Sequence, residues 1–135
     1  MTDAALVAKK LAFIETCVRE LRELARPEAI GRDIRDTRFV EHTLQLAIQA
    51  ALDIAAHVVA DDRLGEPTTN RALFGLLARA GYLDHALAET LARMAGFRNV
   101  VVHGYDDVDP DIVRDILVHH LDDLLSFAAI IRGRL

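Results

Sequence analysis

Apolar residues recur along the chain at spacings of three and four, the period of an amphipathic α-helix. The first stripe predicts a helix over about residues 3–25, which Pro27 ends. A second stripe predicts a helix over about residues 37–60, after a polar connection. The two stripes consist of Val7, Leu11, Ile14, Val18, Leu21 and Ala25, and of Val40, Leu44, Ala47, Ala51, Ile54 and Val58.

Two further helices are bounded by capping residues. Thr69 is a candidate N-cap for a short helix that Gly81 closes. Asp84 is a candidate N-cap for a longer helix that continues towards Val101 and stops by Gly104.

Pro110 suits the first position of a fifth helix, because its fixed φ is already helical. The apolar stripe of this helix is Val113, Ile116, Leu117, His120, Leu124, Phe127 and Ile131. About five helices without a pair of strands predict an all-α fold, an antiparallel bundle in which residues 1–135 form a single domain.

The second and fifth helices carry more apolar residues than one stripe requires. The additional residues are Leu46, Ile48 and Leu52 in the second helix, and Leu121, Leu125 and Ile130 in the fifth. A helix that is apolar around much of its circumference lies at the centre of a bundle or contributes to a dimer surface. Both interpretations stay open at this point.

Composition favours a soluble cytoplasmic protein. The start of the chain lacks the pattern of a secretory signal, and no apolar run approaches the roughly 20 residues that span a bilayer. The single cysteine, Cys17, falls on an apolar stripe and is expected to be a small buried hydrophobe. A net charge of −5 argues against a broad basic surface for nucleic acid, so any such role depends on a few well-placed residues.

The candidate chemistry lies where the fourth helix ends, at Arg98, His103 and Tyr105. A guanidinium binds phosphate in a bidentate way, and an imidazole that titrates near neutrality moves protons to or from a ribose oxygen. These are the requirements of metal-free RNA cleavage through the 2′-hydroxyl. On a regular helix Arg98 and His103 stand about 140° apart, so a loosened last turn would help to bring them together.

Arg98, His103 and Tyr105 form an R-x4-H-x-Y motif, and in this the sequence resembles the HEPN-domain proteins, specifically the HepT-like toxins. These toxins pair with MNT-type minimal nucleotidyltransferase antitoxins. The resemblance covers nearly the whole chain and includes the stretches 41–48, 53–57 and 94–99.

The resemblance implies a HEPN-type bundle that dimerises around a shared endoribonuclease site needing no metal or cofactor. In that site Arg98 binds the scissile phosphate, His103 transfers protons and Asn99 orients the polar groups. It also implies that Tyr105 receives AMP from the nucleotidyltransferase, which inactivates the toxin. The alternative is a helical partner of a nucleotidyltransferase that has no nuclease activity.

The remaining histidines do not predict a metal site. Adjacent residues of a helix point about 100° apart, so His119 and His120 cannot easily share an ion. His57 and Asp61 have ligand spacing but no evident third ligand, which favours a role at the helix end.

Three sets of charged residues have two interpretations each. Asp53, inside an apolar helix, is expected to pair with a cation or a backbone donor, and it is more plausibly structural than catalytic. The acidic residues of segment 106–111 would repel phosphates or attract a basic partner. A basic run is either a solvated face or a contact for RNA or a partner, and it consists of Arg32, Arg35 and Arg38.

Overall fold

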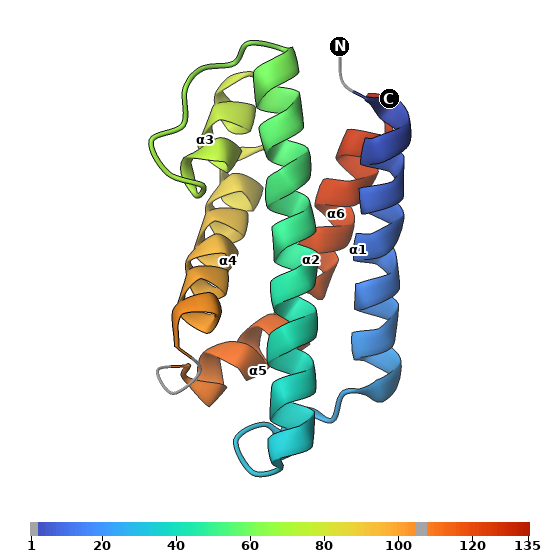
Figure 1. Ribbon diagram of the computed structural model, residues 1–135, viewed down its shortest axis with the longest axis vertical. Coiled ribbons are helices and arrows are strands. Elements are labelled where there is room, and N and C mark those ends of the chain that lie inside the picture. Colours follow the sequence, from blue (N-terminus) through green and yellow to red (C-terminus); the bar gives the residue numbers. More distant parts are fainter. Residues whose placement is uncertain (1–2, 105–107) are drawn as a thin grey trace.

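The computed structural model describes residues 3–104 and 108–135, which form six α-helices and one short 3₁₀ helix (Figure 1). No strand occurs among them, which confirms the all-α prediction. In chain order the elements are α1 (Ala4–Leu24), η1 (Pro27–Ala29), α2 (Ile34–Asp61), α3 (Ala72–Arg79), α4 (His85–His103), α5 (Pro110–His119) and α6 (Leu121–Arg132).

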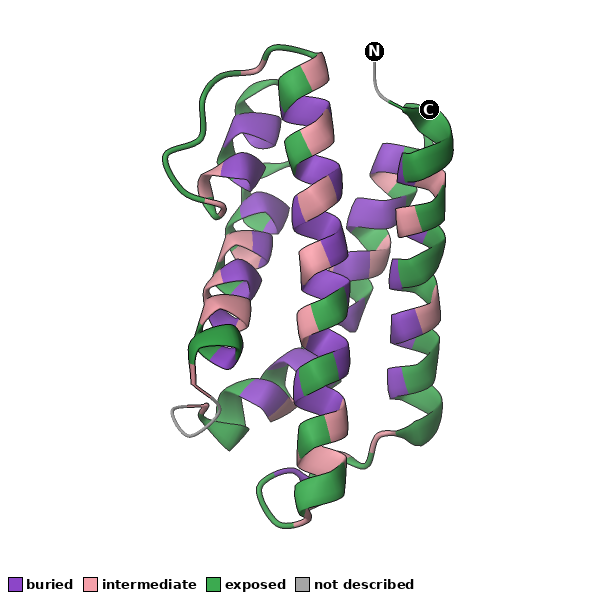
Figure 2. Ribbon diagram, viewed as in Figure 1, coloured by how far each residue is buried: buried purple, intermediate pink, exposed green. Residues whose placement is uncertain are grey.

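The centre of the bundle is α2, which contacts each of the other five α-helices. Figure 2 shows buried residues along most of its length, from Val40 to Val59, and the additional apolar residues Ile48 and Leu52 are among them. Leu46 remains exposed. The surplus apolar surface of this helix therefore reflects its central position.

By length and hydropathy, α2 is also the one helix in the described part of the chain that would be able to span a membrane. Its most apolar window is 61% buried against other helices of the same chain. This burial is what the core helix of a globular bundle requires, so the apolar composition has a sufficient explanation in the fold.

Local signals set most of the helix starts. The Asp84 carboxylate accepts a hydrogen bond from the Leu87 amide at 2.7 Å, as a capping residue does. Thr69 Oγ1 accepts from the Ala72 amide at 3.3 Å, and Pro110 occupies the first turn of α5. The predictions for Asp84 and Pro110 are confirmed. The prediction of Thr69 as an N-cap is wrong, because Thr69 closes the turn before α3 and the N-cap position belongs to Arg71, which makes no side-chain capping bond.

The predicted fifth helix is wrong in one respect, because it is two helices that meet at His120. The backbone of His120 leaves the helical region, with φ −124° and ψ 6°. Its ring holds the junction, with Nδ1 2.8 Å from an Asp123 carboxylate oxygen and Nε2 3.3 Å from one of Asp115. The break lets α5 cross the base of the bundle while α6 lies along α1, which gives six helices where about five were expected (Figure 1).

Cys17 is buried in α1 and unpaired, as expected for a small core residue. Burial raises the pKa of its thiol to about 11, with a smaller contribution from the negative charge of Glu20. The thiol is therefore protonated and inert at neutral pH.

Candidate active site at the end of α4

The residues Arg98, Asn99 and His103 lie in the last turns of α4. Arg98 and Asn99 are half-buried and His103 is exposed, while Phe97 and Val101 anchor the same segment in the core. The helix stays regular to His103, and the Gly104 amide donates to the Val100 carbonyl at 2.9 Å to close it. The loosened turn considered from sequence is therefore absent.

Arg98 is hydrogen-bonded to its neighbour Asn99, which lies between Arg98 and His103 around α4. Its Nη1 donates to Asn99 Oδ1 at 3.0 Å. On a regular helix Asn99 is about 100° from Arg98 and only about 40° from His103. The hydrogen bond therefore turns the guanidinium toward the side of α4 on which His103 lies. The spacing of Arg98 and His103 alone would leave the two side chains about 140° apart.

A residue that sequence reasoning missed holds this arrangement from the other side. Asn70, just before α3, donates from Nδ2 to Asn99 Oδ1 at 3.1 Å, and Asn99 Nδ2 donates back to Asn70 Oδ1 at 3.4 Å. The two asparagines are 29 residues apart, so no local signal connects them. Only the packing of α3 on α4 brings them together.

Not every N–H donor of the Arg98 guanidinium has a hydrogen-bond partner within the described part of the chain. Its Nε is buried and has no hydrogen-bond partner there. An arginine presents five N–H donors in a planar fork; Asn99 takes one on Nη1 and the Nε donor is buried, so the donors left for an anion are the remaining ones on Nη1 and Nη2. Tyr105, the third residue of the motif, lies outside the described residues.

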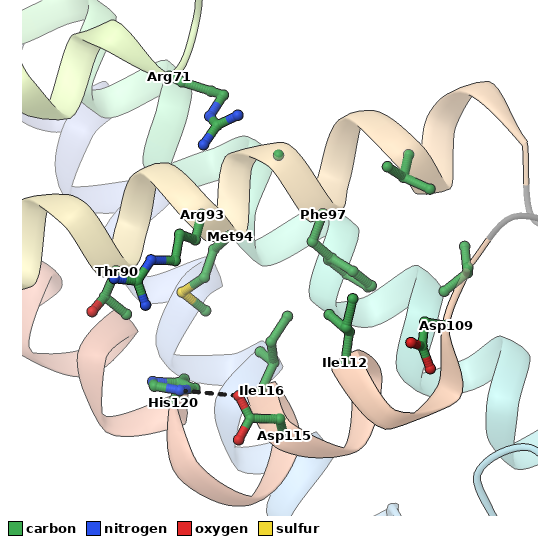
Figure 3. A pocket seen from close by; sticks show the side chains of 13 residues that line it. Arg71, Thr90, Arg93, Met94, Phe97, Asp109, Ile112, Asp115, Ile116 and His120 are labelled. Atoms are coloured by element: carbon green, nitrogen blue, oxygen red, sulfur yellow. Dashed lines mark ion pairs between the residues drawn. The ribbon is translucent and has the colours of Figure 1, made fainter.

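A groove of about 520 Å³ runs between α4 and α5 (Figure 3), and Arg98, Asn99 and His103 are not among the residues that line it. Its floor is apolar, formed chiefly by Met94, Phe97, Ile112 and Ile116. Its charged and polar lining consists of Arg71, Thr90, Arg93, Asp109, Asp115 and His120.

Part of the acidic segment next to the motif is occupied in structural contacts. Asp109 caps α5 by accepting from the Asp111 amide at 2.9 Å. The Asp111 carboxylate in turn lies 2.9 Å from Arg114 Nη1. Both contacts reduce the field that these carboxylates direct at a phosphate, while Asp106 and Asp107 lie outside the described residues.

The other charged candidates serve the bundle. Asp53 pairs with Lys10 Nζ at 3.2 Å and accepts from Gln49 Nε2 at 2.8 Å, so it meets the expected cation, on the α1 side of α2. Arg38 lies 2.8 Å from the carboxylate of Glu41, which is 2% exposed. No group of three or more possible metal ligands occurs within residues 3–104 and 108–135.

A helical bundle with an arginine, an asparagine and a histidine gathered at the end of one helix defines the class as HEPN-type. Residues 14–131 match the model of the family described as "Ribonuclease HepT-like". The chain belongs to this HepT-like family.

Named relatives and solved structures agree with this assignment. The chain is 30% identical over 129 residues to the "mRNA nuclease HepT" of Shewanella oneidensis, covering 95% of this chain and 97% of that protein. It is 41% identical over 105 residues to the "tRNA nuclease HepT" of Aphanizomenon flos-aquae, covering 74% and 71%. Its fold matches the tri-AMPylated Shewanella oneidensis HEPN toxin in complex with MNT antitoxin, with a TM-score of 0.88, 30% identity, and 98% and 99% coverage.

Proposed function

We propose that this protein is a metal-independent endoribonuclease, the toxin of a type VII toxin–antitoxin pair. The observation that carries the proposal is the hydrogen bond from Arg98 Nη1 to Asn99 Oδ1, because Asn99 lies only about 40° from His103 around α4. Membership in the HepT-like family supports it, as do the nuclease names of two relatives.

The chemistry needs a phosphate ligand and proton transfer at two oxygens. The His103 imidazole accepts the proton of the ribose 2′-hydroxyl, and the 2′-oxygen attacks the adjacent phosphorus. Arg98 neutralises the charge that develops on the phosphate oxygens. The bond to the 5′-oxygen breaks, that oxygen receives a proton, and the products are a 2′,3′-cyclic phosphate and a 5′-hydroxyl.

The reaction needs one group that removes a proton and another that donates one, but each motif contains a single histidine. We therefore propose a homodimer. A two-fold axis beside α4 would bring a second His103 to the same cleft and supply both base and acid. The exposed apolar side chain of Val100, about 60° from His103 around α4, is suitable for such an interface.

The proposed partner is an MNT-type nucleotidyltransferase that transfers AMP to the hydroxyl of Tyr105. The similar Shewanella oneidensis toxin is described as tri-AMPylated and in complex with MNT antitoxin, which supports this reaction. An AMP group two residues from His103 would bring a phosphodiester that Arg98 can bind. It would therefore occupy the place that the RNA phosphate needs.

We also propose that residues 1–135 act as one domain and that the enzyme works in the cytoplasm, where its RNA substrate and its partner are found. The buried position of α2 and the protonated, unpaired Cys17 are consistent with this location.

The decisive experiment measures RNA cleavage by the purified protein in the presence of EDTA. Wild type is expected to leave 2′,3′-cyclic phosphate ends, and His103→Ala to cleave at least about 100-fold more slowly, as general acid–base catalysis requires. His119→Ala, at another exposed histidine, is the matched control and should cleave like wild type. Cleavage that requires an added metal, or that survives in His103→Ala, contradicts the mechanism. No cleavage by wild type would favour the inactive binding partner.

A second experiment tests assembly and modification. Light scattering should give the mass of a homodimer, and a fully active monomer would contradict the shared site. Co-expression with the nucleotidyltransferase should add AMP to wild type and none to Tyr105→Phe, as measured by intact mass. Tyr82→Phe is the control, since Tyr82 is the only other tyrosine and its hydroxyl donates to Asp62. AMP on Tyr105→Phe would remove Tyr105 from the mechanism.

A further inference from the structure

A second arginine lies against α4 near the motif, although it belongs to a distant part of the sequence. Arg71 directly precedes α3, and its side chain points toward α4 (Figure 3). A Cβ at Gly96 would lie 3.5 Å from both Cζ and Nη1 of Arg71. The guanidinium therefore lies within van der Waals distance of α4 at Gly96, and an alanine there would still leave room for it.

The neighbouring residue holds Arg71 at this position. Asn70 exchanges two amide hydrogen bonds with Asn99, which also accepts from Arg98. The backbone that carries Arg71 is thus tied to the same asparagine that places the proposed phosphate ligand. Both arginines are therefore connected to the Asn70–Asn99 pair, Arg98 by a hydrogen bond and Arg71 through the backbone.

Arg71 is also free of carboxylate partners within the described ranges. Other arginines near the groove are paired, since Arg93 lies 3.0 Å from Glu89 and Arg114 lies 2.9 Å from Asp111. Arg71 shares the groove with Asp109 and Asp115 but forms no ion pair with either, so its N–H donors stay available to an external anion.

Helix geometry puts Arg71 in line with the catalytic residues. Gly96, Asn99 and His103 share one face of α4, within about 60° of one another. Gly96 and His103 are separated by about 10.5 Å along the helix axis. A strand whose scissile phosphate lies at Arg98 and His103 would therefore meet Arg71 with a different phosphate.

We propose that Arg71 binds a phosphate flanking the scissile one and so forms an additional RNA subsite. The inference rests on the proposed nuclease function and extends it, because Arg71 lies outside the R-x4-H-x-Y motif. Such a contact carries no base information, and it sets the register of the strand on the enzyme.

The experiment compares substrates that differ by one phosphate. A dinucleoside monophosphate contains only the scissile phosphate, and the same molecule with a 5′- or a 3′-terminal phosphate offers one flanking group. Wild type is expected to gain about tenfold in kcat/KM from one of the two additions, the size of one charge-assisted contact. In Arg71→Ala this ratio should fall close to one. Because the ratio is taken within each variant, a general loss of activity cancels.

Two further variants separate this contact from nonspecific effects of charge. Arg79→Ala, at the exposed far end of α3, removes the same charge and should keep the wild-type ratio. Arg71→Lys should keep part of it, because lysine is a point charge without the planar fork. An unchanged ratio in Arg71→Ala, or no gain in wild type from either phosphate, overturns the proposal.

A binding measurement distinguishes this proposal from the nuclease function itself. With a 2′-O-methyl oligonucleotide, which cannot be cleaved by this chemistry, the slope of log K against log salt should fall in magnitude by about 0.7 in Arg71→Ala. If wild type cleaves no RNA but the slope still changes, the nuclease function fails and the Arg71 contact stands. If wild type cleaves RNA and neither slope nor ratio changes, only the Arg71 subsite fails.

Discussion

Asn70→Ala tests whether the site is held together across the α3–α4 contact. The substitution removes both amide hydrogen bonds to Asn99 and changes no group that we place on the substrate. It leaves Asn99 Oδ1 with Arg98 as its single donor and frees the Asn99 side chain to rotate. The expected consequence is a mobile Arg98 guanidinium.

The magnitude follows from the two bonds. At a net contribution of about 0.5–1.5 kcal/mol each, their loss should destabilise the protein by about 1–3 kcal/mol. We expect the lower half of that range, since both asparagines are only half-buried and water can replace part of the contact. Urea unfolding at one fixed protein concentration measures this change.

The effect on catalysis should appear in kcat rather than in KM. A misplaced guanidinium loses contacts that strengthen in the transition state, so we expect kcat to fall by about 10-fold. In an Asn99→Ala background, Asn70→Ala should have almost no further effect on kcat, because Asn70 acts through Asn99. Asn70→Asp should recover part of the activity, since its carboxylate can still accept from Asn99 Nδ2.

Thr68→Ala, an exposed change in the same segment, is the control and should leave stability and kcat unchanged. Additive effects of Asn70→Ala and Asn99→Ala on kcat would refute the reasoning. So would a loss of stability in Asn70→Ala without any change of kcat, which would make the contact purely structural.

Three further predictions concern the bundle. Gly96→Ala should raise stability by about 0.5–1 kcal/mol, a rise of a few degrees in Tm, because alanine restricts the unfolded chain and its Cβ makes an ordinary 3.5 Å contact; a lower Tm would contradict this. Burial raises the pKa of Cys17, so between pH 9 and 11 the thiol ionises in the unfolded chain before it ionises in the folded one, and the free energy of unfolding should fall. Urea unfolding of Cys17→Ala should lack this part of the fall. Phe127→Ala should cost about 3–5 kcal/mol, because Phe127 is fully buried in an edge-to-face contact with Phe74 at 5.8 Å, and a loss below 1 kcal/mol would show that the core closes around the gap.

Local sequence determined most of the helices and the residues of the proposed site. The three- and four-residue periodicity, the capping Asp84 and the first-turn Pro110 act within a few residues of the helix they specify. Arg98, Asn99 and His103 fall within six residues of one helix, so a motif is sufficient to find them. Their mutual placement needs only helix geometry and one bond between neighbours.

Tertiary structure alone decided three other features. The break at His120 has no glycine or proline to mark it in the sequence, and its place follows from the packing of α5 against α2 and of α6 along α1. Whether the surplus apolar face of α2 covers a core or a second subunit depends on how many helices surround it. Asn70 and Arg71 lie against α4 only because α3 packs on it, and a contact between residues 29 apart, such as Asn70 and Asn99, leaves no periodic or capping signal in the sequence.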